Sequence, residues 1–192
     1  MAEAIVFHHA QGLTDGVLAF VEELRRAGHT VHAPDLYEGH AFAALAEGVA
    51  YAQRLGFDAI AERAAAAAAA LPARIVYVGI SLGVLPAQRL AQTRPGARGG
   101  VLISACFPSA EFGQGWPPGV PLQVHGMEAD PEFANEWDLP AARALVNEVE
   151  DSELFLYPGD QHLFMDSSLP DFDEEATALL ARRTLALLGQ LA

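Results

Sequence analysis

Short apolar runs alternate along the chain with longer segments in which hydrophobic residues recur at helical spacing. The apolar runs predict the strands of a buried sheet, at residues 4–8, 30–33, 74–79, 99–104, 121–125 and 153–157. The third run contains Ile-Val-Tyr-Val at 75–78, and an uninterrupted apolar stretch of this kind is typical of a central strand in a parallel sheet.

The segments between these runs have the hydrophobic period of amphipathic helices. They predict helices at residues 15–27, 42–55, 58–71, 82–93, 140–149 and 173–190. Asp15 and Asp58 are expected to cap two of them. The alanine run at 64–70 predicts a helix packed closely on the sheet, because Ala is the best helix former. The Pro- and Gly-rich stretch at 107–119 is expected to be a loop.

Regular alternation of strands and helices predicts an α/β protein. Residues 1–192 are expected to form a single domain, a three-layer α/β/α sandwich with a mainly parallel six-stranded sheet and helices on both faces. Internal repeats and domain linkers are not evident in the sequence.

Composition and charge narrow the possible partners. The chain is 52% hydrophobic and 19% charged, as expected of a globular protein, and its net charge of −14 disfavours nucleic acid and anionic membrane surfaces as partners. Cys106 is the only cysteine, so an intrachain disulfide is impossible, and we expect it to be a small buried hydrophobe. No signal peptide or membrane span is recognised, which predicts a cytoplasmic protein. The protein is expected to be either a monomer or a homodimer.

Gly79-Ile80-Ser81-Leu82-Gly83 carries the strongest chemical signal. A G-x-S-x-G sequence between a strand and a helix is typical of a nucleophile elbow, in which the serine sits on a strained turn. Glycines on both sides permit the close backbone approach that this turn needs, and the helix that follows directs free N–H groups toward the serine. Ser81 is therefore the predicted nucleophile.

A serine nucleophile needs a base and an acid, which in this architecture follow later strands in the order serine, acid, histidine. His162 follows the predicted strand at 153–157, and Asp130 follows the one at 121–125. Both therefore lie where an open α/β sheet places its active site. Other carboxylates nearby are alternatives for the acid, namely Glu128, Glu132 and Asp138.

Four motifs together resemble the dienelactone hydrolase family of α/β-hydrolases over nearly the whole chain. They are Asp35-Leu36-Tyr37 after the second predicted strand, the elbow at 79–83, the spacing from His125 to Asp130, and Tyr157-Pro158-Gly159 followed by His162. The resemblance implies a minimal α/β-hydrolase fold without a cap domain and a triad of Ser81, Asp130 and His162. It also implies an oxyanion hole made of the backbone N–H groups of Ala10, aligned through Gly12, and Leu82.

Three positions differ from the enzymes that give this family its name. Ser81 stands where they have a cysteine, and His9 stands where they have a glutamate that contacts the thiol. Asp166 stands where they have an arginine that binds the substrate carboxylate. Because an acid at this position would repel an anionic lactone, the resemblance supports hydrolase chemistry but argues against dienelactone as the substrate.

The predicted function is a serine hydrolase that cleaves a small ester, lactone or thioester through an acyl-enzyme, without a cofactor. A metal site is not expected, since the spacing of His8 and His9 fits no metal-binding motif. The substrate pocket is expected to include His9, Gln11, Phe107, Trp116 and Phe164, with Phe133 and Trp137 as further candidates. A non-catalytic binding or regulatory protein and an acyltransferase with the same triad are the alternatives.

Overall fold

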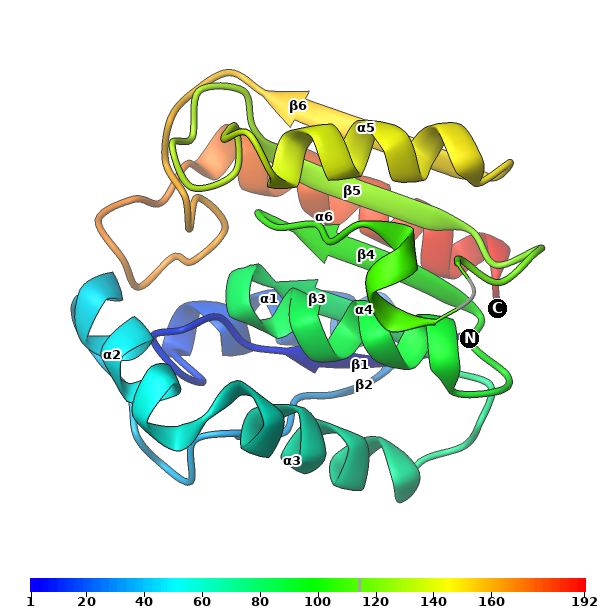
Figure 1. The fold of residues 1–192 in the computed structure, drawn as a ribbon, viewed down its shortest axis with the longest axis horizontal. Helices are drawn as coiled ribbons and strands as arrows, with labels where there is room; N and C mark the ends of the chain where they lie inside the picture. The colour runs from blue at the N-terminus through cyan, green and yellow to red at the C-terminus, as the bar shows by residue number, and fades with distance from the viewer. Residues whose placement is uncertain (114) are drawn as a thin grey trace.

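Six parallel strands form the centre of the computed structural model, which describes residues 1–113 and 115–192 (Figure 1). The strands are β1 (Glu3–Phe7), β2 (Thr30–His32), β3 (Val76–Ile80), β4 (Gly99–Ile103), β5 (Leu122–Met127) and β6 (Ser152–Tyr157). Their order across the sheet is β2-β1-β3-β4-β5-β6, and all five pairings are parallel. The predicted parallel six-stranded sheet is confirmed.

Helices cover both faces of this sheet, which confirms the three-layer prediction. They are α1 (Asp15–Arg26), α2 (Leu45–Leu55), α3 (Phe57–Ala69), α4 (Val84–Thr93), α5 (Asp138–Glu148) and α6 (Glu174–Gln190). Figure 1 shows α1 and α6 behind the sheet and α3, α4 and α5 in front of it. Among the described residues, none of these helices is long and apolar enough to cross a membrane.

Each face of the sheet has its own hydrophobic core. Because side chains alternate along a strand, Val6 and Val78 pack with α1 and α6, while Ile5 and Tyr77 pack on the opposite face. The alanine run lies on α3 as predicted. Its buried alanines, Ala64 and Ala68, belong to the second core, where their small side chains permit close packing.

The starts of two helices differ from the prediction. Thr14 rather than Asp15 caps α1, because Thr14 has extended backbone angles and its side chain accepts the N–H of Val17. Asp58 lies inside the first turn of α3, which starts after Gly56 with no side-chain cap. Carboxylates in a first turn still interact favourably with the positive end of the helix.

Two short 3-10 turns interrupt segments that were predicted as helix and loop. Helix α4 is preceded by η1 (Ser81–Gly83), so the predicted helix at 82–93 begins with a tighter turn. The predicted loop at 107–119 contains η2 (Ser109–Phe112), and residue 114 within it lies outside the described residues. The loops at the carboxyl ends of the strands meet at one edge of the sheet, on the left in Figure 1.

Candidate active site

Ser81 lies on a sharp turn at the carboxyl end of β3. Its φ angle is 49°, in the left-handed region that residues other than glycine rarely adopt. The two glycines of the motif allow the turn to pack tightly: a Cβ on Gly79 would lie 2.5 Å from the carbonyl oxygen of Gly83, and one on Gly83 would lie 2.1 Å from that of Phe7. The G-x-S-x-G motif therefore fits its place between β3, η1 and the end of β1.

Ser81, His162 and Asp130 form a continuous chain of hydrogen bonds. The Ser81 Oγ lies 2.8 Å from His162 Nε2, and His162 Nδ1 lies 2.7 Å from Asp130 Oδ2. The Asp130 side chain is fully buried and that of His162 is 11% exposed. A hydroxyl bonded to an imidazole, which is bonded in turn to a buried carboxylate, is the arrangement that activates a serine.

The alternative acids do not contact His162. Glu128 and Glu132 are exposed, and one Asp138 oxygen accepts the backbone N–H of Cys106. Asp130 is held in place because its second oxygen accepts the Glu132 N–H at 2.9 Å. The carboxylate that meets the histidine is therefore Asp130.

Backbone contacts hold the loop of Asp130 against the loop of His162. The Glu128 N–H donates to the Tyr157 carbonyl at 2.8 Å, and the Ala129 N–H donates to the Gly159 carbonyl at 2.9 Å. These contacts extend the pairing of β5 and β6 beyond the ends of the strands. The sheet itself therefore positions the carboxylate relative to the imidazole.

Ser104 is a site residue that the sequence analysis missed. It follows β4 with a φ of 60°, and its buried Oγ donates to the His162 carbonyl at 2.7 Å. This contact fixes the backbone that carries the imidazole. A serine at the end of a predicted strand gives no distinct signal in a sequence, and a left-handed backbone angle cannot be read from its neighbours.

The turn at residues 9–12 carries the N–H of Ala10, one of the two predicted oxyanion donors. The Gly12 N–H donates to the His9 carbonyl at 3.1 Å. No hydrogen bond from the Ala10 N–H to another described residue is found. The N–H of Leu82, the second predicted donor, lies in the first turn of η1, where the N–H groups of a helix lack intrahelical acceptors.

His9 and Asp166, two positions singled out in the sequence, contact each other. His9 Nε2 lies 2.7 Å from Asp166 Oδ2, and both side chains are fully buried. Burial alone raises the pKa of a carboxyl group, but hydrogen bonds to the carboxylate outweigh that effect and lower the pKa of Asp166 to about 2. The Asp166 carboxylate is thus ionised and enclosed rather than open to a substrate.

Of the other predicted pocket residues, Trp116 lies near the amino ends of the strands and Phe164 is enclosed in the core. Trp116 packs on Gly100 near the start of β4, and its Nε1 donates to the Val120 carbonyl. The loop that carries it has already run back toward the amino end of β5. Phe164 is fully buried in the hydrophobic core, packed on Tyr157. Both predictions of pocket lining were wrong for these positional reasons.

The remaining pocket candidates lie at the carboxyl edge with different contacts. Gln11 is buried and its Nε2 donates to the carbonyls of Phe42 and Ala43, so it links two loops. Phe107 is half-buried just after β4. Phe133 is buried in the core, whereas Trp137 is 75% exposed.

Two further groups at this edge are structural. The Cys106 thiol is buried, which raises its pKa and keeps it protonated at neutral pH. His8 is buried as well: its Nδ1 lies 2.8 Å from the His9 carbonyl, and its Nε2 accepts the Leu36 N–H at 3.0 Å. Burial lowers the pKa of His8 to about 4, so this ring is neutral.

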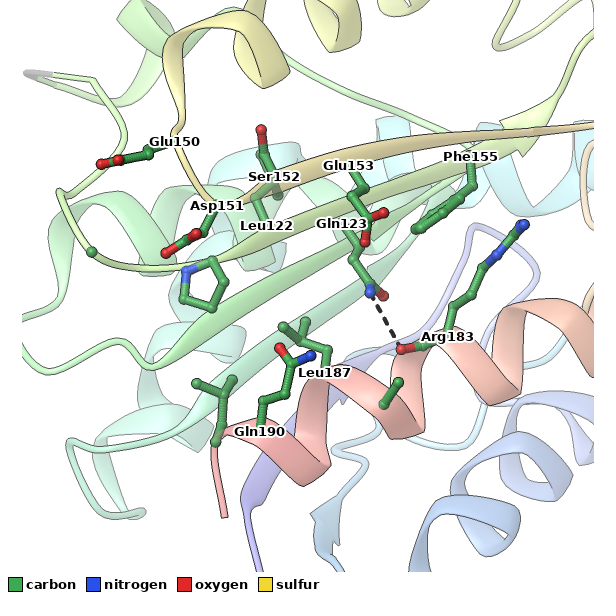
Figure 2. Close-up of a pocket in the computed structure, with 14 residues that line it drawn as sticks. Leu122, Gln123, Glu150, Asp151, Ser152, Glu153, Phe155, Arg183, Leu187 and Gln190 are labelled. Atoms are coloured by element: carbon green, nitrogen blue, oxygen red, sulfur yellow. Dashed lines mark hydrogen bonds between the residues drawn. The ribbon is translucent and has the colours of Figure 1, made fainter.

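A cavity lies at the other end of the molecule. It has a volume of about 720 Å³ and lies between the amino ends of β5 and β6 and the last turns of α6 (Figure 2). Its lining includes Gln123, whose Nε2 donates to the Arg183 carbonyl, and three exposed or half-exposed carboxylates, Glu150, Asp151 and Glu153. It is separate from the triad.

Comparison with known proteins agrees with this architecture. The family model described as dienelactone hydrolase family matches residues 2–192. The chain belongs to the dienelactone hydrolase family. No curated protein sequence matches it.

Solved structures show the same fold at low identity. A dienelactone hydrolase-like promiscuous phosphotriesterase from metagenomic libraries has a TM-score of 0.76 and 20% identity, covering 100% of this chain and 87% of that one. A putative dienelactone hydrolase from Klebsiella pneumoniae subsp. pneumoniae has a TM-score of 0.72 and 16% identity, covering 99% and 87%. The dienelactone hydrolase from Anabaena variabilis has a TM-score of 0.66 and 16% identity, covering 98% and 87%.

In this member of the dienelactone hydrolase family, the hydrogen bond between His9 and Asp166 links the loop after β1 to the loop after β6.

Proposed function

We propose that this protein is a serine hydrolase that cleaves a small ester, lactone or thioester. In this proposal Ser81 is the nucleophile, His162 the general base and Asp130 the residue that orients the imidazole. The observation that carries it is the unbroken hydrogen-bond chain from Ser81 Oγ through both ring nitrogens of His162 to Asp130 Oδ2. Family membership supports the same class of chemistry.

The first half of the reaction acylates the serine. His162 Nε2 takes the hydroxyl proton as Ser81 Oγ attacks the substrate carbonyl, forming a tetrahedral intermediate. The N–H groups of Ala10 and Leu82 would stabilise its oxyanion. When the intermediate collapses, the bond to the leaving group breaks and His162 donates its proton to the departing alcohol or thiol.

The second half releases the acid. A water molecule gives a proton to His162 Nε2 and attacks the acyl-enzyme carbonyl, and collapse of the new intermediate returns the proton to Ser81. Asp130 accepts the Nδ1–H of the ring in both halves. It therefore keeps Nε2 free to act as the base and stabilises the imidazolium that forms at each step.

The test is a panel of p-nitrophenyl esters and acyl-thioesters of graded chain length. Ser81→Ala should lower kcat by at least about 10³-fold on the best substrate while the protein stays folded, because the nucleophile is lost. A fluorophosphonate probe should label the wild type and not this variant. Ser167→Ala is the matched control, since this exposed serine lies on the same side of the molecule.

Two outcomes would overturn the proposal. One is wild-type turnover by folded Ser81→Ala, which would exclude this serine as the nucleophile. The other is a folded wild type that neither hydrolyses any member of the panel nor reacts with the probe, which would favour a binding protein.

A further inference from the structure

The buried His9–Asp166 pair joins two loops that the proposed reaction uses. His9 directly precedes Ala10 in the loop after β1, and Asp166 lies four residues after His162 in the loop after β6. The two side chains are 157 residues apart in sequence and meet at 2.7 Å. The proposed reaction gives neither of them a chemical role.

Among the described residues, every hydrogen bond that the Asp166 carboxylate accepts comes from one of these two loops. Oδ2 accepts from His9 and from the Thr14 hydroxyl, and Oδ1 accepts from the N–H and the hydroxyl of Ser168, the N–H at 2.9 Å and the hydroxyl at 2.6 Å. A buried carboxylate is costly unless such bonds compensate for its lost hydration. Separating the loops would remove the donors on one side, so the charge holds the loops together.

The first turn of helix α1 packs against the same carboxylate. A Cβ on Gly16 would lie 1.7 Å from Asp166 Oδ1, so only glycine fits at this point in the first turn of α1. The carboxylate is therefore confined by the loop after β1, the start of α1 and its own loop. A group packed on three sides has little freedom to move.

The hydrogen bonds of His9 define its tautomer. Its Nδ1 accepts the Gln11 N–H at 3.2 Å, so the ring proton is on Nε2 and is donated to Asp166. The His9 carbonyl also accepts the Gly12 N–H, so this one residue fixes the turn at 9–12 and the direction of the Ala10 N–H within it.

We propose that His9 and Asp166 are positioning residues that hold the oxyanion donor at Ala10 in a fixed position relative to the base at His162. This inference rests on the proposed hydrolase function. We call the hydrogen bond between His9 and Asp166 the bridge. Because oxyanion stabilisation acts on the transition state, loss of the bridge should lower kcat and leave KM nearly unchanged.

The first test compares Asp166→Ala and Asp166→Asn with the wild type. We expect Asp166→Ala to lower kcat about 10- to 100-fold, with KM within about threefold. Phosphonylation by a neutral fluorophosphonate should slow by a similar factor, since it passes through the same oxyanion hole. Asp166→Asn should recover part of the rate, because its amide oxygen still accepts from His9 Nε2 while its NH₂ group faces the N–H of Ser168. Asp171→Ala, an exposed acid on the same loop, is the matched control.

Rates are expressed per active site, titrated with the fluorophosphonate to completion. A purely structural role for the bridge would lower the number of titratable sites and leave the rate per site unchanged.

The pH profile of kcat should keep its shape in Asp166→Asn, because Asp166 is ionised throughout the assay range. His9→Phe is a second variant, which keeps a ring of similar size without its hydrogen bonds, and it should reproduce the loss of kcat.

The inference is overturned if folded Asp166→Ala or folded His9→Phe has the wild-type kcat per site. It is also overturned if the loss appears only in KM. These outcomes differ from failure of the proposed function, which would appear as activity in Ser81→Ala. If Ser81→Ala is inactive and Asp166→Ala has the wild-type kcat, the proposed hydrolase function stands and only the positioning role of His9 and Asp166 is overturned.

Discussion

Asp130 and Glu128 are two residues apart on one loop, but only Asp130 reaches the imidazole. Asp130→Asn should lower kcat by about 10³- to 10⁴-fold, because an amide in place of the carboxylate favours the wrong tautomer of His162. Glu128→Gln should stay within about twofold of the wild type, because Glu128 is exposed. Both are measured as kcat on the best p-nitrophenyl ester. Equal losses in the two variants would contradict the assignment of the acid.

Single residues differed in how well the sequence predicted their place. Ser81 and His162 could be placed because each follows a clear strand in a fixed chain order. The sequence could not decide between Asp130 and the neighbouring carboxylates as the acid, since burial on a loop depends on packing that no local pattern encodes. The contact between His9 and Asp166 could not be foreseen, because nothing in either local sequence points to a partner 157 residues away.

Gly83 packs the elbow closely against the end of β1. Its φ of −65° suits any residue, so only space requires a glycine there. Gly83→Ala would place a methyl group 2.1 Å from the Phe7 carbonyl and push α4 away from β1. We expect a loss of about 3 kcal/mol in the free energy of unfolding and a lower kcat as Ser81 moves with the turn.

Gly189→Ala is the matched control for this substitution. Gly189 lies in α6, and a Cβ added there would have no neighbouring atom within 4 Å, so alanine should stabilise the helix by about 0.5 to 1 kcal/mol. Urea unfolding followed by circular dichroism measures both changes. Midpoints that shift equally, or a higher midpoint for Gly83→Ala, would contradict the steric argument.

The helices and strands were predictable to within a few residues because one hydrophobic period dominates each of them. Details at their ends were not. Thr14 and Asp15 are both good capping residues, and only the backbone angles decide which one precedes the helix. The η2 turn lies in a Pro- and Gly-rich stretch whose local sequence predicts a loop. Trp116 was misplaced because the sequence does not show where that stretch leaves the carboxyl edge.

At the scale of the molecule, the charges are distributed unevenly around the candidate site. The loops that follow the strands at the carboxyl edge, residues 8–14, 33–44, 104–108, 128–137 and 158–173, contain no Arg or Lys. Their acids are Asp35, Glu38, Glu128, Asp130, Glu132, Glu136, Asp160, Asp166, Asp171 and Asp173. Arg63 reaches this edge from α3, but it is paired with Glu38 and the Leu36 carbonyl. The edge is therefore negative.

A negative edge should discriminate among esters by charge. At low salt, a p-nitrophenyl monoester of glutaric acid should have a kcat/KM at least about 10-fold below that of the neutral pentanoate ester, because its free carboxylate is repelled during approach. The gap should narrow as salt rises from 0.01 M to 1 M, since the Debye length falls from about 30 Å to about 3 Å. An ester with a quaternary ammonium group should show the opposite salt dependence. The same ratio at every ionic strength would mean that the charge of this edge does not select the substrate, and that the shape of the pocket alone does.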